Sequence, residues 1–141
     1  MNAEFYFNRG VERSQKRDLQ GAIEDYSAAI TLTSGTIRKT LTTNHPNGSL
    51  ESINVIEKSE GNEGMYFNRA CAYLDLGNYN AAIDDLSKFI EYNQNDAEVF
   101  FKRAVANYCL KNAAHVEQDL ILASSLDPKY NQEALLELFR G

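Results

Sequence analysis

The same four-residue pattern occurs three times in this chain, and this repetition constrains its fold more than any other feature. Tyr6-Phe7-Asn8-Arg9 reappears at 66–69 and, as Phe-Phe-Lys-Arg, at 100–103, each time followed by a small residue. The last two copies start 34 residues apart and the first two start 60 apart, which is one period plus about 26 inserted residues (60 − 34). Units repeated at such a period bury their apolar faces against their neighbours, so we expect a repeat array whose function lies on its stacked surface.

Each copy contains two helical patterns separated by a turn. In the second copy Tyr66, Ala70 and Tyr73 recur at spacings of three and four residues, and the pattern stops at 76–78 before resuming over 82–90. The sequence therefore predicts a helix-turn-helix unit. Small residues recur where two helices must approach closely, and the aromatic residues beside them are interpreted as packing.

A helical hairpin repeated at this period and with this pattern resembles the tetratricopeptide repeat. The matching positions are Tyr66, Ala70, Tyr73, Ala82 and Leu86 in the second copy, Tyr6, Gly10, Ala22 and Tyr26 in the first, and Phe100, Ala104, Leu120, Ala123 and Asp127-Pro128 in the third. Two residues depart from the family pattern: Arg13 stands where an aromatic is expected, and Val116 stands where Ala is usual. The resemblance covers about 100 residues.

The resemblance implies an all-α fold, a right-handed α-solenoid of three helix-turn-helix repeats in a single domain. The repeats are expected at about 3–34, 63–96 and 97–130, with the insertion at about 35–62. Residues 131–140 carry one more amphipathic pattern. They are expected to form a helix that caps the stack.

An arginine and an aspartate recur together in every copy. The pairs are Arg9 with Asp25, Arg69 with Asp85, and Arg103 with Asp119, and the spacing along the chain is identical in all three. A charged set repeated three times could bind a ligand, but equal spacing within each copy favours an ion pair between the two helices of one repeat. Such a pair would fix the helix packing, and removing one partner of a buried pair costs about 3–5 kcal/mol.

The groove expected of the family gives the candidate binding residues. In that family the first helix of each repeat lines a concave groove, which here implies Phe7, Asn8, Val11, Phe67, Asn68, Cys71, Phe101, Lys102 and Val105. Three phenylalanines would form a solvent-facing column, which is costly unless a ligand covers it. The alternative is that the insertion or the C-terminal helix covers the column within the same molecule.

Family members that clamp the C-terminal carboxylate of chaperone tails use five groove residues, mostly Lys, Asn and Arg. Here Asn68 and Lys102 match two of them, whereas Phe7, Val11 and Glu98 occupy the other three positions. An anionic terminus would lose most of its charge-assisted hydrogen bonds. We therefore expect a peptide ligand with apolar anchors, whose backbone Asn68 could hold.

Three conformations compete for the insertion. Residues 36–43 and 50–57 flank an Asn-His-Pro-Asn-Gly-Ser turn sequence, which is compatible with a β-hairpin. Alternatively the second helix of the first copy continues to about Leu41, or the segment is a mobile loop. Long loops in compact domains are often functional, so the insertion could lie over the groove or contact a partner.

Composition and reactive residues disfavour several classes of function. The net charge of −6 over 141 residues argues against nucleic acid and anionic membranes as partners and favours a basic peptide. His45 and His115 lie in different regions without a nucleophile or metal-ligand cluster, and adjacent carboxylates such as Asp84 and Asp85 fit solvated helix surfaces, so we expect no enzyme, cofactor or metal. Cys71 and Cys109 are expected to be buried or half-buried free thiols.

The leading hypothesis is a non-catalytic protein-interaction module, a scaffold or co-chaperone-like adaptor that binds a partner peptide in its groove. The alternative is a structural role in which the array stacks on itself, as a homo-oligomer, or on further repeats. The chain has no apolar run long enough to span a membrane and no signal-peptide pattern at its first residues. A cytoplasmic location is therefore the expectation, and it lapses if the chain is a fragment.

Overall fold

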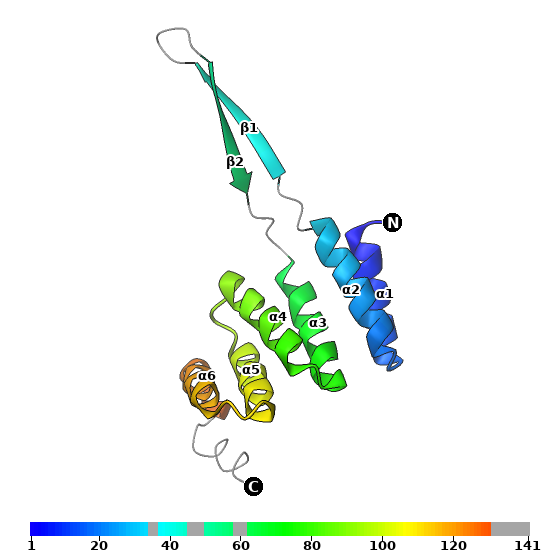
Figure 1. Cartoon of the computed structure of the whole chain (residues 1–141), viewed down its shortest axis with the longest axis vertical. Helices are drawn as coiled ribbons and strands as arrows, with labels where there is room; N and C mark the ends of the chain where they lie inside the picture. Colours follow the sequence, from blue (N-terminus) through cyan, green and yellow to red (C-terminus); the bar gives the residue numbers. More distant parts are fainter. Residues whose placement is uncertain (34–36, 45–49, 58–61, 131–141) are drawn as a thin grey trace.

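The computed structural model describes residues 1–33, 37–44, 50–57 and 62–130. Six α-helices form three antiparallel pairs that pack side by side in chain order (Figure 1). The pairs are α1 (Ala3–Gln15) with α2 (Leu19–Thr33), α3 (Glu63–Leu76) with α4 (Tyr79–Tyr92), and α5 (Ala97–Cys109) with α6 (Ala113–Leu126), followed by the short 3-10 helix η1 (Pro128–Tyr130). The predicted all-α repeat array is confirmed. The capping helix expected at 131–140 lies outside the described residues.

The helix boundaries follow from local chemistry. The Asn2 side chain accepts a hydrogen bond from the Phe5 amide at 2.9 Å, and Asp96 accepts one from Glu98 at 3.1 Å, which satisfies amide groups at the starts of α1 and α5. The turn between the two helices of each repeat passes through one residue with positive φ: Arg17 (64°), Gly77 (77°) and Lys111 (61°). These three positions are equivalent under the repeat offsets, so the turn geometry is shared by all three repeats.

Small residues set the distance between the paired helices. A Cβ atom added to Gly10 would lie 2.7 Å from a ring carbon of Tyr26, so only glycine fits at that point of the first repeat. Ala70 and Ala104, at the same position of the other repeats, are completely buried. The core therefore runs along the array between first and second helices.

The insertion contains an antiparallel β-hairpin that projects away from the helices (Figure 1). Its strands are β1 (Ile37–Asn44) and β2 (Leu50–Glu57), and Leu41 pairs with Ile53 near the middle of the register. Of the three conformations considered for this segment, the helical continuation to about Leu41 is wrong because α2 ends at Thr33. The hairpin is an addition to the otherwise helical described chain.

Candidate binding surfaces

The arginine and aspartate of each repeat lie against each other across the helix pair. In each case the guanidinium donates two hydrogen bonds to the carboxylate: 2.9 and 2.7 Å for Arg9–Asp25, 2.8 and 2.7 Å for Arg69–Asp85, and 2.9 and 2.8 Å for Arg103–Asp119. The three carboxylates are almost fully buried. Charge-assisted bidentate bonds of this kind fix orientation as well as energy, so these side chains hold the helices of one repeat together.

Two of these arginines also connect neighbouring repeats. Arg69 donates to Ser27 Oγ of α2 at 3.1 Å, and Arg103 donates to Ser87 Oγ of α4 at 3.2 Å. Sequence reasoning missed the serines, although their separation along the chain equals the offset between the first two copies of the pattern. Each arginine therefore binds its own second helix and the second helix of the preceding repeat.

The candidate groove residues lie along the first helices α1, α3 and α5. Asn8 is exposed, and the other eight are partly exposed. The Phe67 ring lies 5.9 Å from the ammonium nitrogen of Lys102, which brings α3 and α5 together across the groove. Lys102 also forms an ion pair with Glu98 at 3.8 Å.

The three phenylalanines of the column, Phe7, Phe67 and Phe101, are only partly exposed. The sequence had led us to expect side chains that face the solvent freely. Each ring contacts an aromatic ring from the second half of its own repeat: Phe7 lies 5.8 Å from Tyr26, Phe67 lies 5.9 Å from Phe89, and Phe101 stacks on Tyr130 at 5.1 Å. One side of each ring is therefore used in the core. The remaining exposed area is what a ligand could cover.

The two cysteines differ in environment. Cys71 is half-buried in the groove, where burial raises the pKa of its thiol and the charge of Lys102 partly opposes that shift. Cys109 is exposed, so the expectation that both thiols are at least half-buried is wrong for this residue. It is the last residue of α5.

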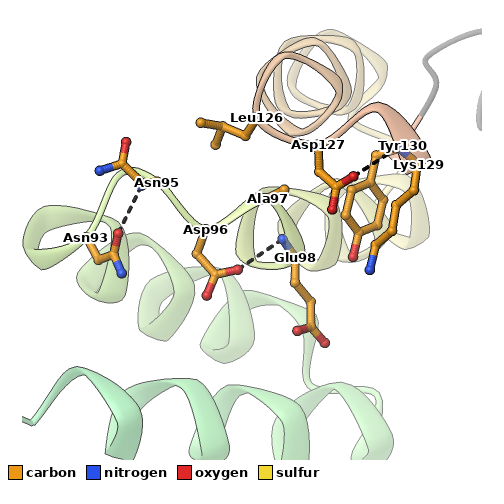
Figure 2. A pocket seen from close by; sticks show the side chains of 9 residues that line it. All are labelled: Asn93, Asn95, Asp96, Ala97, Glu98, Leu126, Asp127, Lys129 and Tyr130. Carbon is orange, nitrogen blue, oxygen red and sulfur yellow. Dashed lines mark hydrogen bonds between the residues drawn. The ribbon is translucent and has the colours of Figure 1, made fainter.

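A polar hollow of about 340 Å³ lies at the third repeat, lined by residues that precede and begin α5 and by residues around η1 (Figure 2). Its acidic and amide groups are largely engaged in local turns, since Asn93 accepts from the Asn95 amide and Asp127 accepts from the Lys129 amide. Glu98 and Tyr130 line this hollow and also contact candidate groove residues, Lys102 and Phe101 respectively. The polar groups of the hollow are therefore used mainly to shape the turns around it.

Reactive groups do not converge elsewhere in the described chain. His115 is exposed at the start of α6, and His45 lies outside the described residues. Among the residues that the structure places, no group of three His, Cys, Asp or Glu side chains could hold a metal ion. Within the same residues, no helix combines the length and the apolar character needed to cross a bilayer.

A sequence profile described as tetratricopeptide repeat matches residues 3–35 and 63–96. No curated protein matches the chain by sequence. Among solved structures, the TPR domain of Arabidopsis OM64 has a TM-score of 0.71 at 18% identity, over 98% of this chain and 93% of that one. At this sequence identity the structural likeness shows a shared fold and nothing more.

Two further structures of this fold contain peptides. The first TPR of Spaghetti (RPAP3), bound to the HSP90 peptide SRMEEVD, has a TM-score of 0.71 at 16% identity over 99% of this chain and 90% of that one. The second TPR domain of human RPAP3, in complex with the HSP70 peptide SGPTIEEVD, has a TM-score of 0.70 at 19% identity over 99% of both chains.

Proposed function

Because the chain is built from tetratricopeptide repeats, we propose that it is a non-catalytic protein-interaction module that binds a partner peptide along α1, α3 and α5. The observation that carries this proposal is the contact between Phe67 and Lys102, which joins two first helices into one surface. A scaffold or co-chaperone-like adaptor uses such a surface to hold a segment of another protein. The fold of the peptide-bound relatives supports the same function.

Half-buried aromatic rings suit this role. Each ring of the column (Phe7, Phe67 and Phe101) is held on one side by the core, so little conformational entropy is lost when a ligand covers the other side. Such rings form shallow apolar sites at the spacing of the first helices. An extended peptide with apolar side chains would match that spacing, and Asn68 would bind its backbone groups.

The charges along the groove favour a neutral or basic peptide. Lys102, the candidate cation for a carboxylate clamp, is already engaged by Glu98 and by the Phe67 ring. Glu4 and Glu12 are exposed on α1, which adds negative charge on the same helices. We therefore expect peptides ending in Glu-Glu-Val-Asp, such as those bound by the two relatives, to bind this chain weakly.

A peptide array probed with the purified protein tests the groove. The variants Phe67→Lys and Lys102→Glu should both lose peptide binding. Phe67→Lys should also lower the melting temperature, because one side of the Phe67 ring packs in the core, so binding is measured at a temperature where both variants are folded. Leu32→Lys and Lys111→Glu introduce the same charges at exposed positions away from the candidate groove residues and serve as controls. Binding that survives both groove variants, or that is lost equally in the controls, would contradict the proposal.

A second candidate function is self-assembly by stacking. Ile121, Leu122 and Leu126 are 39–46% exposed on α6, the last described helix, which would favour packing against another copy or further repeats. Light scattering coupled to size exclusion would then show an oligomer that grows with protein concentration, and Leu122→Lys would return it to a monomer. A monomer at all concentrations would contradict stacking and leave the peptide-binding proposal intact.

A further inference from the structure

A cleft of about 450 Å³ opens between repeats two and three, on the side of the second helices α4 and α6. It shares no residue with the candidate groove. Its lining residues come from α4, α5, α6 and the turn between α5 and α6. They are Asn80, Ile83, Ser87, Arg103, Asn107, Leu110, Asn112 and His115.

At the junction between repeats one and two, the position equivalent to this cleft is occupied by the side chain of Tyr73. There Tyr73 packs against Leu19 and Ile23, and the guanidinium carbon of Arg69 lies 5.9 Å from the centre of its ring. Ile23 is only 6% exposed as a result. An aromatic ring between an arginine and an isoleucine thus closes the first junction.

At the second junction the repeat offset places Asn107 at the position of Tyr73. Its side-chain amide donates to the Arg103 carbonyl of the same helix at 3.1 Å, so the shorter side chain turns back toward α5. Ile83, the equivalent of Ile23, is only partly buried. The cleft is therefore the space that an aromatic ring occupies in the preceding junction.

We propose that this cleft is a second binding site, which takes an aromatic side chain, tyrosine above all, from a partner protein. Ile83 and Leu110 provide apolar walls for the ring, and the guanidinium of Arg103 provides a cation for its π face. Asn80, Asn112 and His115 offer polar groups to a phenol hydroxyl at the rim.

The geometry of Arg103 favours a ring over an anion. Its Nε and Nη2 donate to Asp119, and its Nη1 donates to Ser87, so three of its five in-plane N–H donors, including both that face Asp119, are already used. An anion requires those in-plane donors, whereas an aromatic ring uses the face of the guanidinium. Arg69 combines the same three hydrogen bonds with the ring of Tyr73, which shows that both modes coexist in this fold.

The test is a titration of the full chain with p-cresol, the side-chain analogue of tyrosine, followed by nuclear magnetic resonance. We expect saturable shifts of the amide signals of Arg103, Asn107 and His115, and nuclear Overhauser contacts between the cresol ring and the methyl groups of Ile83 and Leu110. 4-Methylcyclohexanol has a similar size without a π face and should bind several-fold more weakly. Absence of these ring contacts in the native protein would overturn the proposal without any variant.

Variants at position 107 then separate filling of the cleft from damage to the fold. Asn107→Tyr should close the cleft from within, raise the melting temperature by a few degrees and abolish the cresol shifts. Asn107→Ala leaves the space open and should keep them. The groove variant Phe67→Lys should also keep them, which distinguishes this site from peptide binding along the first helices. Cresol shifts that persist in folded Asn107→Tyr would overturn the assignment.

Discussion

The two repeat junctions share one set of hydrogen bonds and differ in the side chain that fills the space beside the arginine. At both, an arginine held by its own aspartate also donates to a serine of the preceding repeat, Ser27 or Ser87. The first junction is closed by Tyr73, whereas the second has Asn107 and a cleft. The comparison teaches that polar groups set the stacking geometry, while apolar filling decides how closed each junction is.

The largest expected effect comes from removing the shared polar element. Asp85→Ala should lower the free energy of unfolding by about 3 kcal/mol, because Arg69 would remain mostly buried without its carboxylate. Thermal or urea denaturation measures the change. Asp119→Ala should cost a similar amount through Arg103, since the two sites have the same geometry.

The neighbouring residue provides the matched control for that experiment. Asp84 is exposed on the same helix, so Asp84→Ala should change stability by less than about 0.5 kcal/mol. At a temperature well below its lowered melting midpoint, the Asp85→Ala variant is folded and should still bind groove ligands. Selective loss of ligand binding with normal melting would instead assign the aspartate to the binding surface.

The ring of Tyr73 carries the difference between the junctions. Tyr73→Asn copies the second junction into the first and should lower the free energy of unfolding by about 2 kcal/mol, because packing against Leu19 and Ile23 is lost. Tyr73→Phe keeps the ring and should lose far less. Equal effects of the two variants in urea denaturation would mean that the hydroxyl, and not the ring, closes this junction.

The serines contribute less. Ser27→Ala and Ser87→Ala should each cost about 1 kcal/mol, the usual net value of one hydrogen bond. Because the arginine keeps its aspartate, no unpaired charge results. A clearly larger loss at one serine would show that the two junctions use this bond differently.

The smallest effect is expected at an ion pair of the first junction that the second junction cannot form. Arg17 lies 3.4 Å from Asp75 across the first junction, and both side chains are largely exposed. The equivalent positions at the second junction are Gly77 and Cys109. Asp75→Asn should therefore cost less than about 1 kcal/mol at low salt and nothing measurable near 1 M salt, when its stability is followed by urea denaturation.

The sequence was sufficient for the fold because the pattern occurs three times. The two offsets between copies align small, aromatic and charged positions that reinforce each other, and the six α-helices of the described residues form three helix-turn-helix units. The insertion occurs once, so nothing in the chain could decide among hairpin, helix and loop. Its strands depend on pairing between β1 and β2, which local propensity describes poorly.

The candidate sites were only partly predictable. Position in the repeat indicated the helices that carry the candidate groove residues, but the burial of Phe101 depends on stacking with Tyr130, a contact between residues of different helices. The cleft has a signal in the sequence that aligned copies reveal, namely Asn107 against Tyr73. The structure was needed to interpret this substitution, because it shows that the position without an aromatic ring borders an open cleft.

The difference between the two repeat junctions also affects the order in which the repeats unfold. In a nearest-neighbour array, a repeat detaches when its one or two interfaces are broken, and the weaker interface yields first. Repeat three, beyond the incompletely filled junction, should therefore open while repeats one and two remain folded together. Amide protons of α5 and α6 would then exchange with solvent through this partial opening, and those of α2 and α3 only through global unfolding. A partner that fills the cleft at the second junction would slow exchange throughout the third repeat.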